Sequence, residues 1–283
     1  MKRIICLLAA GVMCAALFGF DRDYGPIQKK QMAQVGEKFL FRDVFGNEFN
    51  TVLNPEVARH DYKKDCFVLE KHKMYYRGDT KYRSRLGVDI SHHDGDVNWK
   101  KLKKEGFDFV ILRVGYRGYQ SGSLNEDRNF EKNIKGALKA GFDVGIYIFS
   151  QADSEKEALE EAEFVLRKIK DYNITLPVFY DPEIIRDDSA RSDNITGEQF
   201  TKNAIVFCET VKKAGYTPGV YSNMLWEAYE FDLSKFSDYV IWYADYEAKP
   251  QTPYRFEFWQ YAEKDGDIKA PYDVDVMMVR TEK

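Results

Sequence analysis

Carboxylate side chains recur at one kind of position in this sequence, at or just after the end of a short run of β-forming residues. Asp89, Asp181 and Glu183 follow such runs, and Asp275 lies in the last of them with Asp273 two residues before it. Carboxyl groups that converge in one site can divide acid and base roles between them, because their mutual repulsion separates their pKa values. The pattern therefore predicts an acid/base site.

The spacing of Asp181 and Glu183 supports a shared role. A strand that stays extended through both residues directs them to one face, with Cα atoms about 6.6 Å apart at roughly 3.3 Å per residue. An isolated aspartate at a strand end more often only solvates a loop, so the prediction depends on several carboxylates converging. The candidate catalytic residues are Glu183, Asp181, Asp89 and Asp275.

Aromatic residues accompany these carboxylates on or beside the same β-forming runs. Each aromatic side chain alone is more typical of a core, but aromatic faces backed by carboxylates are what a sugar-binding cleft requires. The aromatic candidates for substrate binding are Tyr147, Phe149, Tyr221, Trp242 and Trp259.

From residue 86 onward, short β-rich runs alternate with helical stretches, which is typical of βα units around a largely parallel sheet. Glycines that follow the helical stretches, and capping residues such as Ser154 and Thr196 that precede them, mark the helix ends. We expect an α/β fold, an irregular (β/α) barrel of about eight strands with reduced helices in the last third. An open doubly wound sheet is the alternative. The expected strands are 86–90, 109–114, 144–149, 177–181, 219–222, 240–244, 256–261 and 274–278.

The chain divides into three parts on composition. Residues 1–20 carry Lys2-Arg3 and then an apolar run, which predicts an export signal or an uncleaved N-terminal anchor. Residues 21–85 are polar and irregular with two short β-like runs, and predict a small accessory segment. Residues 86–283 are expected to form the catalytic barrel. The protein is therefore expected outside the cytoplasm, in the periplasm, the cell envelope or the medium, with the anchor as its only membrane contact.

Composition limits the partners. The 283 residues include 42 Lys and Arg against 46 Asp and Glu, a net charge of −4, and there is no long basic run for nucleic-acid binding. His92-His93-Asp94 lacks further ligands nearby, so polar loop packing is favoured over a metal site, and no cofactor is expected. Cys66 and Cys208 remain after the leader, and either a disulfide or free thiols are compatible with the sequence. A monomer is expected.

Residues 86–280 resemble the family 25 glycoside hydrolases, the N-acetylmuramidase lysozymes that cut peptidoglycan. The resemblance implies an irregular α/β barrel and a peptidoglycan substrate. Its motifs, in chain order, are Gly87-Val88-Asp89-Ile90-Ser91-His92-His93 with Asn98-Trp99, Phe109-Val110-Ile111-Leu112-Arg113, Gly145-Ile146-Tyr147-Ile148-Phe149, Asp181-Pro182-Glu183, Tyr221-Ser222-Asn223, Trp242 with Ala244 and Tyr246, Trp259-Gln260-Tyr261 and Val274-Asp275.

The resemblance implies cleavage of the β-1,4 bond between N-acetylmuramic acid and N-acetylglucosamine. Glu183 would be the general acid, and Asp181 would orient the substrate's own N-acetyl group, with stereochemical retention. Asn223 and Gln260 join the substrate-binding candidates on the same basis. The residues themselves supply a consistent reason, since the surrounding aspartates disfavour ionisation of Glu183 and raise its pKa.

Three positions depart from the family pattern: Ile148 in place of His, Pro182 in place of Val, and Met277 in place of Asn. With all four carboxylates present, we expect an active enzyme with altered substrate contacts. The alternative is a catalytically inactive peptidoglycan-binding protein on the same barrel. A chitinase-like enzyme is disfavoured, because the longer Asp-rich strand motif of those enzymes is absent around Asp181.

Overall fold

The computed structural model describes residues 22–185, 187 and 189–281. The predicted leader, residues 1–20, lies outside this part of the chain. Within the described residues, no helix has both the length and the apolar character needed to cross a bilayer. Cys66 and Cys208 are both buried, free thiols.

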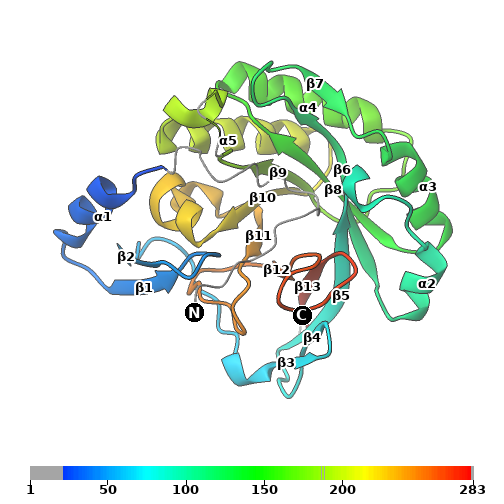
Figure 1. Cartoon of the computed structure of the whole chain (residues 1–283), viewed down its shortest axis with the longest axis horizontal. Helices are drawn as coiled ribbons and strands as arrows, with labels where there is room; N and C mark the ends of the chain where they lie inside the picture. Colours follow the sequence, from blue (N-terminus) through cyan, green and yellow to red (C-terminus); the bar gives the residue numbers. More distant parts are fainter. Residues whose placement is uncertain (1–21, 186, 188, 282–283) are drawn as a thin grey trace.

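Within the described residues, eight strands close into a barrel, because β5 pairs with both β13 and β6 (Figure 1). The predicted α/β barrel is confirmed, with one difference: β13 runs antiparallel to both of its neighbours, whereas the other adjacent pairs are parallel. The short strand β7 (Leu124–Glu126) extends the sheet beside β6. In order around the barrel, the strands are β5 (Tyr82–Ile90), β13 (Asp273–Arg280), β12 (Phe258–Ala262), β11 (Val240–Ala244), β10 (Pro218–Asn223), β9 (Val178–Pro182), β8 (Asp143–Ser150) and β6 (Phe109–Arg117).

In the described part of the chain, the helices that connect the barrel strands lie along one side of the barrel (Figure 1). They are α2 (Trp99–Lys104), α3 (Phe130–Lys139), α4 (Glu155–Ile169) and α5 (Gly197–Lys213). After α5, the described chain has only short helical turns, η4 (Trp226–Glu230) and η5 (Leu233–Phe236), as predicted for the last third. Helix α4 has the features that predict a helix from sequence: Ser154 caps its first turn, and one face is buried.

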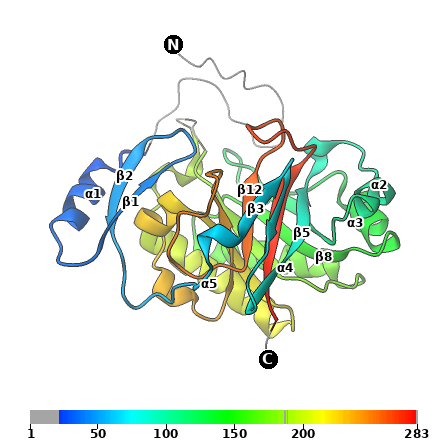
Figure 2. The same ribbon diagram turned by 90° about the horizontal axis from the view of Figure 1, so that it is seen from below.

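The N-terminal segment covers much of the side that the helices leave open (Figure 2). It contains α1 (Gly25–Met32), the hairpin of β1 (Lys38–Arg42) and β2 (Glu48–Val52), the turn η1 (Lys64–Cys66), and the hairpin of β3 (Phe67–Glu70) and β4 (Lys73–Tyr76). Phe67 packs edge-on against Trp259 of β12 at 5.2 Å between ring centroids, and the Tyr261 hydroxyl donates to the His72 carbonyl at 2.8 Å. These hairpins therefore supply part of the outer layer of the barrel.

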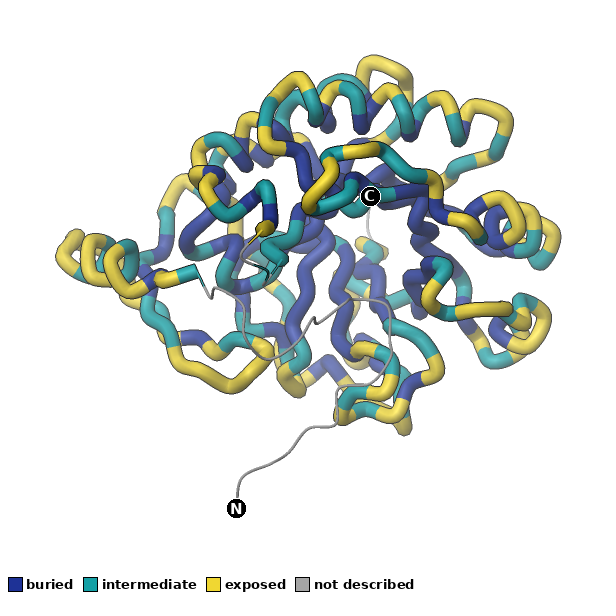
Figure 3. The backbone as a smooth tube through the Cα atoms, turned by 45° about the horizontal axis from the view of Figure 1, so that its top comes forward, coloured by how far each residue is buried: buried dark blue, intermediate teal, exposed yellow. Residues whose placement is uncertain are grey.

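Alternation along the strands sorts side chains between the barrel interior and this outer layer. The central strands are largely buried along their length (Figure 3). The interior cluster includes Phe109, Phe179, Trp242 and Phe258. Gly87 and Gly219 make room for it: a Cβ on either glycine would lie 2.3 Å and 2.4 Å, respectively, from a Phe ring. The polar interior residues lie beyond this apolar floor, toward the C-terminal ends of the parallel strands, where barrel enzymes carry their sites.

Candidate active site

The barrel brings the four predicted carboxylates to one end of its interior. Asp89 lies near the end of β5, Asp181 near the end of β9, and Glu183 one residue beyond β9. Because β13 is antiparallel, its beginning lies at the same end, and Asp273 pairs with Asp89 in the strand register. Asp275, two residues on, shares the interior face with Asp273. The reversed strand therefore places Asp275 with the carboxylates of the parallel strands.

A hydrogen-bond network orients two of these carboxylates. Gln260 Nε2 donates to Asp89 Oδ2 at 2.8 Å, while Gln260 Oε1 accepts from the hydroxyls of Tyr221 at 3.1 Å and Tyr246 at 3.0 Å. Trp242 Nε1 donates to Asp275 Oδ1 at 2.7 Å. Both carboxylates are buried, and each is held by a side chain from a strand two places away around the barrel, Asp89 by β12 and Asp275 by β11.

Two buried carboxylate oxygens in the site accept no hydrogen bond from the described residues. Asp181 Oδ1 and Asp275 Oδ2 are buried, and neither has a hydrogen-bond partner among the described residues. A buried acceptor without a donor costs free energy, and such groups concentrate where function requires them. Asp181 is therefore able to accept a hydrogen bond from an N–H or O–H group of a ligand.

Arg113 on β6 places a cation beside the acids. Its Nε donates to Asp127 Oδ2 at 2.9 Å, and its Nη2 lies 2.6 Å from His92 Nδ1. His92 is thus engaged in this cluster, and the described residues include no group of three His, Cys, Asp or Glu placed to hold a metal ion. Sequence reasoning gave Arg113 no role, although its alternation with Phe109 on β6 directs it inward.

The electrostatics favour a proton on Glu183 near neutrality. Burial raises the pKa of Glu183 to about 7; the Arg113 charge opposes this, and Asp273 adds to it. Burial and the neighbouring Glu183 likewise raise the pKa of Asp181 well above its ordinary value, again against Arg113. Repulsion between two close carboxyl groups favours one shared proton. The pair can therefore deliver a proton at neutral pH.

The other two acids are also held in an environment that favours protonation. Burial, together with Asp273 and Asp275, raises the pKa of Asp89, and burial raises that of Asp275 against its bond from Trp242. Asp273 itself has its pKa raised to about 7, chiefly by burial. Sequence reasoning noted Asp273 at the strand end but assigned it no role, although its spacing of two from Asp275 indicates the same face.

Comparison with known proteins decides the family. The sequence model of Glycosyl hydrolases family 25 matches residues 88–268, which is more than half of the chain. The chain belongs to this family.

Two curated relatives are lysozymes. "Probable GH family 25 lysozyme 2" of Dictyostelium discoideum is 29% identical over 168 residues, which cover 58% of this chain and 73% of that protein. Lysozyme M1 of Streptomyces globisporus is 29% identical over 68 residues, or 24% of this chain and 21% of the relative. The chain thus matches about a fifth of Lysozyme M1.

Solved structures share the fold. The modular autolysin LytC of Streptococcus pneumoniae superposes with a TM-score of 0.56 at 25% identity, covering 84% of this chain and 56% of LytC. A family 25 glycosyl hydrolase of Bacillus anthracis superposes with a TM-score of 0.57 at 24% identity, covering 76% of this chain and 95% of that one. The superposition on the Bacillus anthracis enzyme, at 24% identity, supports the barrel fold alone.

Within this family 25 barrel, the predicted binding residues do not all lie in the interior. Tyr147, Tyr221 and Gln260 face the carboxylates, and half-buried Phe149 pairs with Asp181 in the register of β8 and β9. Asn223 ends β10, where its Oδ1 accepts from two backbone N–H groups of the turn that follows.

Trp259 lies on the outer side of the barrel wall, away from the carboxylates. Trp259 is fully buried in the outer layer against Phe67, and its Nε1 donates to the Asp245 carbonyl at 2.8 Å. Its neighbour Gln260 points inward, so strand alternation sends Trp259 outward. Trp242 does face the interior, but it is only 1% exposed, and its role there is to hold Asp275 through its indole N–H.

The side chains at the three departures from the family pattern do not point toward the acids. Ile148 is fully buried in the outer core, behind Tyr147 and Phe149. Met277 pairs with Phe258 in the apolar floor. Pro182 is the buried last residue of β9, where alternation turns it opposite to Asp181. The structure therefore gives no support to the expectation that these positions alter substrate contacts.

Proposed function

We propose that this protein hydrolyses peptidoglycan, cutting the β-1,4 bond between N-acetylmuramic acid and N-acetylglucosamine. The observation that carries the proposal is the Asp181 and Glu183 pair at the barrel mouth, with the pKa of Glu183 raised to about 7. Family membership supports glycosidic hydrolysis. The LytC structure with a synthetic peptidoglycan ligand supports the substrate class. The proposed partner is therefore a peptidoglycan glycan strand.

In the proposed mechanism, the carbonyl oxygen of the substrate's N-acetyl group attacks the anomeric carbon. Glu183 gives its proton to the leaving glycosidic oxygen, and Asp181 accepts a hydrogen bond from the N-acetyl N–H. Glu183, now ionised, takes a proton from water as that water opens the cyclic intermediate. Two displacements on opposite faces retain the anomeric configuration. The buried, unpartnered Asp181 Oδ1 supports this role for Asp181.

The remaining polar residues support positioning of the sugar. Tyr147, Tyr221 and Phe149 offer aromatic surface beside the acids, and Gln260 fixes Asp89. Asp89 and Asp275 supply acceptors and, with Asp273, disfavour further negative charge in the site. These assignments keep Trp242 as the support of Asp275 and leave Trp259 out of the site.

Fragment analysis of digested peptidoglycan tests the proposal. Purified peptidoglycan is incubated with the protein, and the released fragments are reduced and analysed by mass spectrometry. We expect reduced N-acetylmuramic acid at the new ends. Reduced N-acetylglucosamine would contradict the proposed bond, and the absence of fragments would favour the glycan-binding alternative.

We further propose that the protein is exported, on the strength of the predicted leader and a wall polymer as substrate. Fractionation of cells that make the full chain tests this. Mature protein is expected in the envelope or the medium, and an intact Met1 in the membrane fraction would indicate the anchor. Full-length soluble protein in the cytoplasm would contradict export.

A further inference from the structure

The backbone of Glu183 lies just outside the barrel ladder. Strands β8 and β9 pair in parallel register up to Ser150 and Pro182, so Gln151 and Glu183 are the next pair along. Beyond this point, a side-chain hydrogen bond takes the place of the backbone hydrogen bonds between β8 and β9. Gln151 Nε2 donates to the Glu183 carbonyl at 2.6 Å and to the Ser150 carbonyl at 3.0 Å. Gln151 is only 2% exposed, so this contact is shielded from water.

The same amide also bonds the far end of the segment that follows Glu183. Gln151 Oε1 accepts from Ser192 Oγ at 3.1 Å, within the turn η3 (Arg191–Asn194). One side chain therefore joins the start of this segment, at Glu183, to its end, at Ser192. Because a fixed position of a reacting carboxyl group depends on its backbone, loss of this amide would release Glu183.

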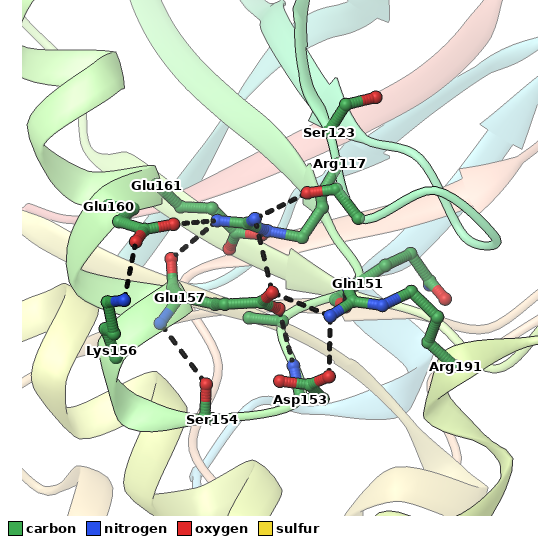
Figure 4. Close-up of polar contacts among 12 residues, drawn as sticks. Arg117, Ser123, Gln151, Asp153, Ser154, Lys156, Glu157, Glu160, Glu161 and Arg191 are labelled. Carbon is green, nitrogen blue, oxygen red and sulfur yellow. Dashed lines mark hydrogen bonds and ion pairs between the residues drawn. The ribbon is translucent and has the colours of Figure 1, made fainter.

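Arg191 reinforces the position of Gln151 from outside (Figure 4). Its Nη2 contacts Asp153 Oδ2 and Glu157 Oε1, each at 2.6 Å, and its Nη1 donates to the Gln151 carbonyl at 3.4 Å. Its backbone N–H donates to the Tyr119 carbonyl at 2.9 Å. Arg191 therefore ties the Gln151 backbone to Asp153, to Glu157 of α4 and to the loop at Tyr119.

A buried ion pair holds the residue before Gln151. Glu161 of α4 is fully buried; its Oε1 accepts from Arg117 Nε at 2.8 Å and its Oε2 from Ser150 Oγ at 2.6 Å. Arg117 is also almost fully buried, and its Nη1 donates to the Gly122 carbonyl at 2.7 Å. A charge pair with its remaining donors satisfied is rigid, because any movement would leave a buried charge unpaired.

We propose that Gln151 is a positioning residue that holds Glu183 for proton transfer. This inference rests on the proposed function, since it deepens the role given there to Glu183. Gln151 bonds the backbone carbonyl of Glu183 and not its carboxyl group, so it acts by fixing the backbone of the general acid. It keeps the half-buried Glu183 in the position from which its carboxyl group can give a proton.

The test compares Gln151→Met, nearly isosteric but without an amide, with Gln151→Asn, whose amide is one methylene too short to reach Glu183. For both we expect kcat to fall about 10- to 100-fold with KM nearly unchanged, because misplacing a reacting group by about 1 Å has effects of this size. The alkaline limb of the kcat/KM profile should move to lower pH, as the freed carboxyl gains water. Carboxyl 13C titration of Glu183, assigned with Glu183→Gln, should show the same fall in pKa.

Gln120→Met is the matched control. Gln120 is exposed and contacts the same segment at Ser189 Oγ, 2.5 Å away, but does not reach Glu183, so kcat and the pH profile should stay as in the wild type. Wild-type kcat and Glu183 pKa in a folded Gln151 variant would overturn the inference, as would a loss fully explained by the unfolded fraction. A wild type that releases no glycan fragments would instead count against the proposed function.

Discussion

At Glu183 a single atom decides whether a proton is available. Glu183→Gln keeps the shape of the side chain but cannot deliver a proton, so hydrolysis should fall on the order of 10²- to 10⁴-fold. Glycan sedimentation and the unfolding temperature should be close to wild type. Release of reducing ends from peptidoglycan measures the loss, and activity within about tenfold of wild type would remove Glu183 from the acid role.

The pH dependence follows from the same group. Its pKa is raised to about 7, chiefly by burial, and the protonated form is the active one. Activity should therefore be lost as pH rises through about 7, giving kcat/KM an alkaline limb there. Initial rates on soluble glycan fragments between pH 5 and 9 check this. A rate constant unchanged up to pH 9 would show that this carboxyl is not the acid.

Asp181 separates two retaining mechanisms. If it orients the N-acetyl group, Asp181→Asn should slow hydrolysis strongly, and sugars without that group should not react. If Asp181 were the nucleophile, a slow fluorosugar would label it and the N-acetyl group would be dispensable. Peptide mapping by mass spectrometry distinguishes them. A labelled peptide containing Asp181 would contradict the proposed role of Asp181. It would not contradict the proposal that the protein is a glycosidase.

At the scale of elements, the barrel floor depends on missing Cβ atoms. Gly87→Ala would place a methyl group 2.3 Å from the Phe109 ring, inside a closed core. Overpacking of this kind should lower the free energy of unfolding by roughly 1 to 3 kcal/mol. Denaturant unfolding measures it, with Gly118→Ala as the control, since there the new Cβ meets the exposed Ser121 hydroxyl. Equal stability of the two variants would argue against a tightly packed floor.

The positions of the strands were predictable from sequence. The direction of β13, the face on which a given side chain lies and the strand register were less so. Apolar runs indicated all eight barrel strands, because each is buried on both faces. Nothing in the run around Val274 indicates that β13 is antiparallel, since alternation is the same in either direction. The aromatic character of Trp259 does not show which face of β12 it occupies, whereas its adjacency to the inward-facing Gln260 does. The bond from Gln151 to Glu183 depends on strand register, which the sequence does not state.

At the scale of the whole molecule, buried acids make stability depend on pH. Glu227 of η4 lies between the N-terminal segment and the barrel, beside a cavity of about 330 Å³, and burial raises its pKa from 4.5 to about 8. The unfolded chain loses this proton near pH 4.5 and the folded chain only near 8, so stability should fall as pH rises between these values. Maximum stability is therefore expected on the acid side of neutrality.

Glu227→Gln tests this directly. The amide can still accept from the Thr252 hydroxyl but has no charge to bury, so the variant should be more stable than wild type at pH 8 by roughly 1 to 4 kcal/mol, at about 1.4 kcal/mol per pKa unit. At pH 4 the two proteins should unfold at similar denaturant concentrations. Equal stability at pH 8 would show that Glu227 is ionised without penalty in the folded protein.

The reversed strand β13 has a consequence for the order of assembly. It joins β12 to β5, pairing Arg280 with Tyr82 across nearly two hundred residues of chain, and it carries Asp273 and Asp275. Contacts so distant in sequence form slowly, and here they involve the last described strand. During synthesis, a chain that has emerged only as far as β12 therefore has neither a closed barrel nor a complete set of acids. Hydrolytic competence should appear only after β13 has docked between β12 and β5.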